Sequence, residues 1–253
     1  MAGMQLLPLG EFPLVNPGDD LARLIADGLT QNKIAAQHGD VIAIAQKVVS
    51  KAEDRYVALT SVTPGAEAIR LAGLVDKDPR LIELILAESS EVVRSRPGVI
   101  IVRHKLGYVH ANAGIDRSNI QQTEEEQVLL LPENPDASAV ALRSRLLELL
   151  GVDLHVLIND SAGRAWRNGT VGMTIGSSGF AVLKDQIGES DLLGNTLEVT
   201  VTAVADELAA AASFVMGQGA EATPVVVIRG AKLGASPSGS SELIRERDLD
   251  LFR

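Results

Sequence analysis

The sequence contains no cysteine, few aromatic residues and no long apolar run, and each absence excludes a class of protein. Without cysteine there is no disulfide, thiol nucleophile, iron–sulfur cluster or cysteine-based zinc site. No stretch reaches the ~18 uncharged apolar residues that a membrane helix requires. The net charge of −10 argues against a nucleic-acid surface, and an aromatic share of 3% leaves few rings to stack on bases.

Familiar catalytic and nucleotide-binding motifs are also missing. The sequence has no phosphate loop, no HExxH zinc-protease motif and no GxSxG serine-hydrolase motif. Residues 217–222 fit G-x-G-x-x-A, but they follow a predicted helix and precede a predicted strand. A dinucleotide-binding fold requires the opposite order, so we reject that interpretation.

What is present is the pattern of a folded protein with mixed α and β structure. An apolar share of 46% over 253 residues is ordinary for a globular chain. Helices and strands do not alternate one for one, so we predict an α+β fold of mixed sheets with flanking helices. Val- and Ile-rich runs predict buried strands at 41–49, 98–104, 126–132, 154–160, 197–204 and 223–230. Apolar spacing predicts helices over 79–93, 138–150 and 205–216, and another that Asp19 or Asp20 caps.

We expect residues 1–253 to form a single catalytic unit. The best internal break is PENPD at 132–136, which places a subdomain boundary near residue 135. The first residues lack a basic head and a clear cleavage site. We therefore expect no secretory signal and a cytoplasmic location.

Polar residues gather at the ends of apolar runs, and two of these clusters contain an aspartate. NAGIDRSN includes Asp116, and INDSAGRAWRNG includes Asp160, Ser161, Arg164 and Arg167. Each aspartate taken alone also fits a turn former. Two acidic strand ends beside amide, hydroxyl and guanidinium groups fit a divalent cation that holds a phosphate. We therefore take Asp116, Asp160 and Arg164 as candidate catalytic residues.

Two further segments have both a structural and a functional interpretation. MGQGAEATP, from Met216 to Pro224, fits a helix end, but its glycines would also let the backbone approach a ligand closely. QKVVSKAEDR places Lys47 and Lys51 on a segment that leaves a buried strand. This second segment fits either a solvated basic edge or a phosphate contact.

The remaining candidate residues give weaker indications of a functional role. The four histidines are scattered, and none is spaced like a metal pair. Trp166, the only tryptophan, is expected to line the site around Asp160. TIGSSGF, at 174–180, fits either a backbone nest for an anion or a flexible turn.

Together these segments resemble the coenzyme F420:L-glutamate ligase family, also described as F420-0:gamma-glutamyl ligase. The resemblance runs in family order from about residue 12 to about residue 231. It is carried by FPLVNPGDDL, QKVVSKAEDR, VHANAGIDRSN, LLLPENPDASA, INDSAGRAWRNGTVGMTIGSSGF and the stretch from KDQIGESDLL to VVVIRG. Some bacterial members carry a fused flavin-type domain, and this chain resembles the stand-alone form.

The resemblance implies a GTP-dependent ligase that joins L-glutamate to the deazaflavin coenzyme precursor F420-0. The first amide forms at the lactyl carboxylate, later glutamates are gamma-linked, and the expected intermediate is an acyl phosphate. The implied cofactors are a divalent metal, Mn²⁺ or Mg²⁺, and a monovalent cation, K⁺. The implied assembly is an intertwined homodimer with no membrane or nucleic-acid partner.

The resemblance also assigns residues by motif. The metal-binding positions are Asp116, Asp160, Ser161 and Gln218. Lys47 departs mildly from the family pattern, since a small hydroxyl residue also occurs there, and Arg164 is our own addition from its charge. The GTP-binding positions are Phe12, Pro13, Leu14, Val15, Gln46, Lys47, Lys51, Asn119, Met216, Gly217, Gln218, Gly219, Ala220, Glu221, Ala222 and Thr223.

Two alternatives remain open from the residues alone. A metal-dependent phosphohydrolase would use the same two aspartates without a carboxylate acceptor. A non-catalytic nucleotide or cofactor binder would use them only as turn residues.

Overall fold

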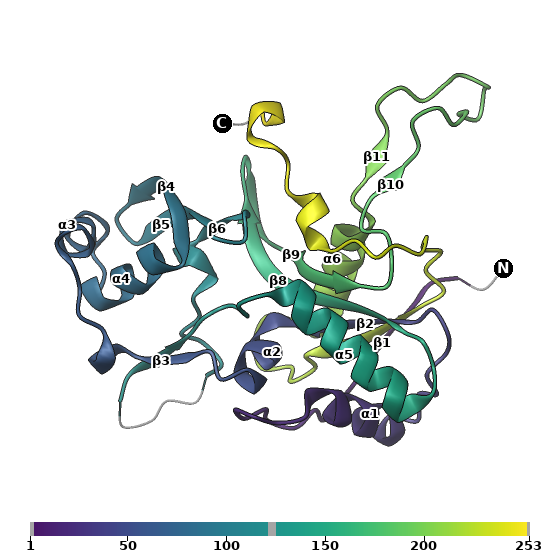
Figure 1. The fold of residues 1–253 in the computed structure, drawn as a ribbon, viewed down its shortest axis with the longest axis horizontal. Helices are drawn as coiled ribbons and strands as arrows, with labels where there is room; N and C mark the ends of the chain where they lie inside the picture. Colours follow the sequence, from purple (N-terminus) through teal and green to yellow (C-terminus); the bar gives the residue numbers. More distant parts are fainter. Residues whose placement is uncertain (1–2, 121–124, 252–253) are drawn as a thin grey trace.

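A five-stranded mixed sheet forms the centre of the large lobe (Figure 1). The computed structural model describes residues 3–120 and 125–251. The strands lie in the order β1 (Gln5–Pro8), β12 (Val225–Arg229), β2 (Val41–Ala45), β8 (His155–Arg164) and β9 (Arg167–Ser178). The β2–β8 pair is parallel and the other pairs are antiparallel. Together with the helices described below, this mixed arrangement confirms the α+β prediction.

Helices cover both faces of this sheet, because its three inner strands are apolar on both sides. Ile42, Ile44 and their neighbours pack against α1 (Leu21–Gln31) and α5 (Pro135–Leu150). Val41 and Ala43 face the other way, toward α6 (Val204–Met216). Alternation along a strand sends successive side chains to opposite faces, so each run supplies two core layers.

Local capping signals fix where two of the helices begin and end. The Asp20 side chain accepts the Arg23 N–H at 3.0 Å and caps α1, as predicted. Helix α5 starts earlier than the predicted residue 138, because Asn134 caps it and accepts the Ala137 N–H at 3.0 Å. Gly151 ends α5 in the left-handed conformation, and the helix stops at residue 150 as predicted.

The small lobe is formed by the elements between residues 56 and 129 (Figure 1). It contains β3 (Tyr56–Ala58), α3 (Ala66–Val75), α4 (Pro79–Ala87), β4 (Ser89–Arg96), β5 (Val99–His104), β6 (Val109–Ala111) and β7 (Gln127–Leu129). Strands β4, β5 and β6 pair in that order, and β3 pairs with β7. The lobe has its own apolar core, and the chain re-enters the large lobe at α5, which begins at residue 135.

Three predicted elements differ from the structure. The helix expected over 79–93 stops at Ala87, because residues 89–96 pair with β5 instead. The strand expected over 41–49 ends at Ala45, where α2 (Gln46–Ala52) begins. The run 197–204 is exposed or half-buried and not buried, and its only strand is the two-residue β11 (Val201–Thr202).

Two extensions leave the large lobe. Strands β10 (Lys184–Asp185) and β11 form the base of an arm that projects from the body, as Figure 1 shows. The C-terminal segment is held by Asp136, which accepts the backbone N–H groups of Ser177 and Ser240 at 2.9 and 2.8 Å.

Across residues 3–120 and 125–251, no helix combines the length and apolarity needed to cross a membrane.

Helix α6 lies very close to β9 because residue 172 is glycine. A Cβ there would stand 2.3 Å from the Ala209 carbonyl oxygen and 2.5 Å from Ser213 Cβ. Gly172 is paired with Ser161 across the β8–β9 ladder. The close approach therefore sets the distance between the end of α6 and the middle of β8, where the candidate site lies.

Candidate functional site

Three segments of the large lobe converge at one edge of the central sheet. Ala45, the last residue of β2, is in register with Asn159 of the parallel strand β8, so α2 begins beside Asp160. The Ala45 N–H also donates to the Pro224 carbonyl at 2.8 Å, which brings the loop after α6 to the same edge. The carboxyl ends of parallel strands are where such folds place their ligands.

The small lobe brings Asp116 to this edge on an irregular turn. The turn Asn112–Gly114 has three successive left-handed residues, with φ values of 52°, 55° and 68°. Such a conformation costs about 1–3 kcal/mol at a non-glycine residue and is typical of functional sites. Asp116 then exchanges two backbone hydrogen bonds with Leu129, at 2.9 and 3.0 Å, which fix the backbone that carries its carboxylate.

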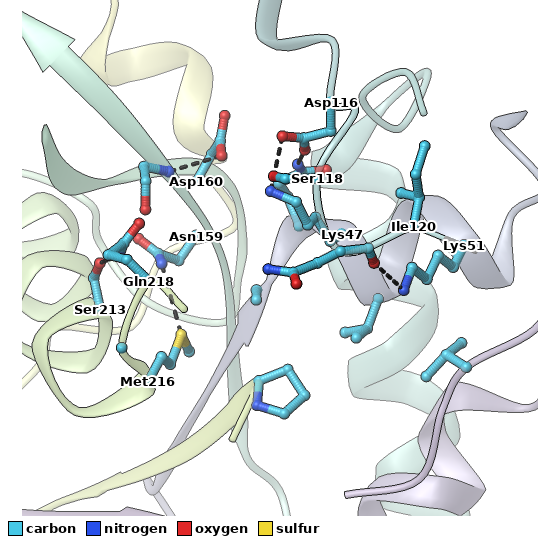
Figure 2. Close-up of a pocket in the computed structure, with 18 of the residues that line it drawn as sticks. Lys47, Lys51, Asp116, Ser118, Ile120, Asn159, Asp160, Ser213, Met216 and Gln218 are labelled. Carbon is cyan, nitrogen blue, oxygen red and sulfur yellow. Dashed lines mark hydrogen bonds and ion pairs between the residues drawn. The ribbon is translucent and has the colours of Figure 1, made fainter. Parts of the chain in front are cut away.

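The two lobes enclose a cavity of about 850 Å³. Figure 2 shows Asn159, Asp160 and Gln218 on one side of it, and Lys47, Asp116 and Lys51 on the other. All the residues assigned by motif line this cavity: Phe12, Pro13, Leu14, Val15, Gln46, Lys47, Lys51, Asp116, Asn119, Asp160, Ser161 and Met216 to Thr223.

Arg164 and Arg167 do not line the cavity. Strand β8 continues past Asp160 to Arg164. Asp160 and Ser161 therefore lie within the strand, whereas the sequence predicted that they lie at its end. Arg164 and Arg167 are exposed at the tip of the β8–β9 hairpin, outside the residues that line the cavity. Trp166 is 88% exposed at the same tip, so the expectation that it lines the site is wrong.

The Asp116 carboxylate is held at both oxygens by the first turn of α2. Lys47 Nζ lies 2.8 Å from Oδ1, and Gln46 Nε2 donates to Oδ2 at 2.5 Å. Ser50 Oγ donates to Gln46 Oε1 at 2.9 Å, which orients the Gln46 amide. Burial raises the pKa of the Asp116 carboxyl, with a smaller contribution from the Asp160 charge, while Lys47 and Gln46 oppose the rise.

Asp160 has a partner that the sequence did not reveal. His110 Nε2, on β6 of the small lobe, lies 3.0 Å from Asp160 Oδ2, and both side chains are largely buried. Burial is the largest single influence on His110 and opposes its protonation, but Asp160, Ala111 and Asp116 outweigh it and raise the His110 pKa. No spacing signal marks this pair, because β6 and β8 meet only through the tertiary fold.

The end of α6 presents Gln218 to the cavity. Gly217 ends the helix with φ 75° and ψ −179°, a conformation open essentially only to glycine. Gln218 Nε2 donates to Ser213 Oγ at 3.1 Å, and this leaves its carbonyl oxygen available as a ligand. Glu221 folds back and accepts the Gly219 N–H at 2.8 Å, which shapes the following turn.

Asn119 connects the two sides of the cavity. Its side-chain amide donates to the Gly219 carbonyl at 3.2 Å, and its own carbonyl accepts from Lys51 Nζ at 2.8 Å. Burial and then the nearby Lys47 charge lower the pKa of Lys51, while Asp116 opposes that shift. One residue of the small lobe thus contacts both α2 and the loop after α6.

The oxygen donors at this edge fit a hard divalent cation. Asp116 and Asp160 supply carboxylates, Ser161 a hydroxyl and Gln218 an amide oxygen. Buried Asn159 Oδ1 has no hydrogen-bond partner among the residues that the structure describes, which adds a free oxygen beside Asp160. Among the described residues no three acidic or imidazole groups cluster, so neutral oxygens must complete the shell. Mg²⁺ commonly binds through one or two carboxylates together with water and substrate phosphates.

Comparison with known proteins assigns the chain to a family. The family model for F420-0:gamma-glutamyl ligase matches residues 10–230. This chain belongs to that family. It is 44% identical to coenzyme F420:L-glutamate ligase of Methanothermobacter thermautotrophicus over 253 residues, which covers 99% of each chain. The same-named proteins of Methanopyrus kandleri and Archaeoglobus fulgidus are 45% and 41% identical, over 100% and 96% of their lengths.

Membership of the F420-0:gamma-glutamyl ligase family applies to both lobes. The matched region begins before the Phe12 loop and ends after β12, so it includes every segment that lines the cavity. The resemblance stated from the sequence is therefore confirmed at the level of the family.

Proposed function

We propose that this chain is a ligase that joins L-glutamate to coenzyme F420-0 at the expense of GTP. Relatives that are 41–45% identical over nearly their whole length carry the name coenzyme F420:L-glutamate ligase. The single observation that carries the proposal is the cavity between the lobes, where two carboxylates, two lysines and an oxygen-rich helix end face one space. This set suits phosphoryl transfer, which depends on positioning and charge neutralisation.

The proposed reaction has two steps. An oxygen of the acceptor carboxylate attacks the terminal phosphorus of GTP, and GDP leaves, which forms an acyl phosphate. The glutamate amine then attacks the acyl carbon, loses a proton and expels phosphate, so that an amide remains. Neither step needs a covalent nucleophile from the protein, which agrees with the absence of cysteine.

The residues of the cavity have distinct parts in this proposal. The loop Phe12–Val15, α2, Asn119 and the turn Met216–Thr223 form the nucleotide-binding wall. Lys51 supplies a positive charge at the phosphates, and Asn119 holds the Lys51 side chain in place. Asp116, Asp160, Ser161 and Gln218 would hold the divalent cation, Mn²⁺ or Mg²⁺, which offsets phosphate charge when bound. The implied K⁺ would need an oxygen-lined place beside the same carboxylates.

The β8–β9 hairpin is proposed to contact the acceptor, not the nucleotide. Arg164 and Arg167 lie beyond the cavity on the strands that carry Asp160 and Thr170, with side chains exposed to an incoming anionic molecule. We propose that Arg164 positions the anionic precursor and takes no part in the transfer of the phosphoryl group.

A homodimer is proposed from the apolar surface of the arm. Leu192, Leu193 and Val199 on the arm are almost fully exposed, and Phe214 on α6 is 89% exposed. Apolar groups of this size on an extension are typical of interaction sites. Replacing Leu192 and Leu193 by serine should convert a dimer to a monomer in light scattering, and an unchanged mass would refute this arrangement.

GDP release tests the proposed reaction. Purified protein is incubated with GTP and Mn²⁺, with and without F420-0 and glutamate, and the products are identified by mass spectrometry. GDP and a glutamyl product that both require the two substrates support ligation. GDP formation that needs neither substrate supports a phosphohydrolase, and the absence of GDP formation supports a binding protein.

A further inference from the structure

Lys47 places a fixed positive charge directly on a carboxylate of the candidate metal site. Its Nζ lies 2.8 Å from Asp116 Oδ1, and both side chains line the cavity. Helix α2 begins at Gln46, so Lys47 stands in the first turn, next to the residue that binds the other Asp116 oxygen. The ammonium therefore belongs to the same rigid support as the carboxylate it contacts.

The pair differs from an ordinary surface salt bridge. The Lys47 and Asp116 side chains are only 29% and 20% exposed, so solvent screens their attraction incompletely. The other basic groups nearby are engaged elsewhere, since Lys51 donates to the Asn119 carbonyl and His110 contacts Asp160. Lys47 is thus the cation that Asp116 meets directly within the described cavity.

The charge count at the site shows what this contact does. Asp116 and Asp160 are its two carboxylates, and the Lys47 ammonium lies directly on the first while His110 contacts the second. Asp116 therefore has a positively charged partner before any cation or substrate binds. A monovalent cation at Asp116, in addition to the divalent one, would lie next to the Lys47 ammonium and be repelled by it. The place beside Asp116 is therefore occupied by the chain itself.

We infer that Lys47 serves as a built-in monovalent cation of the metal site, in the place at Asp116 that K⁺ would otherwise take. An ammonium group is a compact point charge, similar in charge and size to K⁺. This inference rests on the proposed function, because it requires that a divalent cation binds at Asp116 and Asp160. It makes Lys47 a positioning residue that acts through Asp116, and it predicts an enzyme that works without K⁺.

Mn²⁺ binding without substrates tests the inference. The variants are Lys47→Ser, uncharged polar Lys47→Gln and charge-retaining Lys47→Arg, with exposed Lys232→Ser as the matched control outside the cavity. Free Mn²⁺ is counted by electron paramagnetic resonance in buffers that contain either KCl or choline chloride at equal ionic strength. Circular dichroism melting checks that each variant is folded, and Lys47→Gln replaces Lys47→Ser if the serine variant is not.

In choline we expect Lys47→Ser to bind Mn²⁺ about tenfold more tightly than wild type, because a nearby positive charge is lost. K⁺ should weaken that binding toward the wild-type value, whereas wild type, Lys47→Arg and Lys232→Ser should respond to K⁺ by less than about twofold. In the ligation assay, Lys47→Ser should need K⁺ or NH₄⁺, and wild type should not.

Equal Mn²⁺ affinity and equal K⁺ response in wild type and Lys47→Ser would overturn the inference while wild type still ligates glutamate. A wild type that itself requires K⁺ would also overturn it. If wild type neither binds Mn²⁺ nor forms a glutamyl product, the proposed function fails and this inference fails with it.

Discussion

Replacing Gly172 by alanine should damage both the fold and the site, and the structure gives the size of the effect. The new Cβ would stand 2.3 Å from the Ala209 carbonyl oxygen and 2.5 Å from Ser213 Cβ. The carbonyl belongs to helix α6 and cannot rotate away, so α6 must move outward from β9. Overpacking typically costs about 1–3 kcal/mol, and a backbone contact this short places the expected loss of unfolding free energy near ~3 kcal/mol.

For a chain of this length, ~3 kcal/mol corresponds to a fall in melting temperature of about 6–12 °C. Scanning calorimetry and urea unfolding measure the loss. The displaced helix also carries Ser213 and Gln218 away from Ser161, the cross-strand partner of residue 172. We therefore expect weaker Mn²⁺ binding in Gly172→Ala even at temperatures where the protein remains folded.

Gly163→Ala is the matched control. Gly163 lies on the paired strand β8, and a Cβ there would have no neighbour within 4 Å. Removing backbone freedom from the unfolded chain should leave this variant unchanged or more stable by up to about 1 kcal/mol. If Gly172→Ala melts at the same temperature as Gly163→Ala, the close packing of α6 on β9 is not what holds the site together.

Three further predictions concern single side chains. Asp116→Asn should leave the melting temperature unchanged and lower the ligation rate by more than about 100-fold. Loss of a group that only supports a metal ligand costs roughly 10–100-fold, and loss of the ligand itself should cost more. A normal ligation rate would show that Asp116 is not a metal ligand. Lys51→Ala should raise the KM for GTP about tenfold with little change in stability, and steady-state kinetics with an unchanged KM would refute its phosphate contact. The His104 ring, then Lys105 and Arg55, lower the pKa of Glu88 against the opposing effect of burial, so Glu88→Gln should cost about 1 kcal/mol at pH 7. A depressed carboxyl pKa stabilises the fold fully above the unfolded value and progressively less as pH falls through the lower folded value. This difference should therefore shrink once pH falls below about 4, and a constant difference in urea midpoints would contradict it.

Much of the fold could be predicted from short-range signals. Asp20 and Gly151 bound helices where capping rules place them, because a cap depends on groups within a few residues. The apolar runs at β2, β8 and β12 were also recognisable, since strands buried on both faces leave little room for polar residues.

The failures arose where distant pairing overrides local pattern. Residues 89–93 continue a helical spacing, yet they pair with β5, and only the position of β5 decides this. TIGSSGF resembled a loop because of its small residues, but most of it lies in β9. Small residues are needed in this part of β9 because the helices pack closely on it. A Cβ at Gly172, just before this segment, would collide with α6, and a Cβ at Gly176, within it, would collide with Pro135 of α5.

The candidate site divides in the same way. Lys51, Asp116 and the turn Met216–Thr223 lie far apart along the chain, and family resemblance alone placed them together from the sequence. His110 was passed over because an isolated histidine carries no spacing signal, while its 3.0 Å contact with Asp160 joins two lobes. Arg164 was selected for its charge and position near Asp160, but the continuation of β8 carries it beyond the cavity.

The sequence by itself determined the exclusion of thiol chemistry, the α+β class, the capped helices and the family, because these depend on composition, local hydrogen bonds and ordered motifs. The tertiary structure decided which polar and charged groups share one space. The contact of Lys47 with Asp116 and that of His110 with Asp160 arise from the docking of a small lobe onto the sheet edge. No local rule predicts such contacts, because they depend on how two separately packed cores fit against each other.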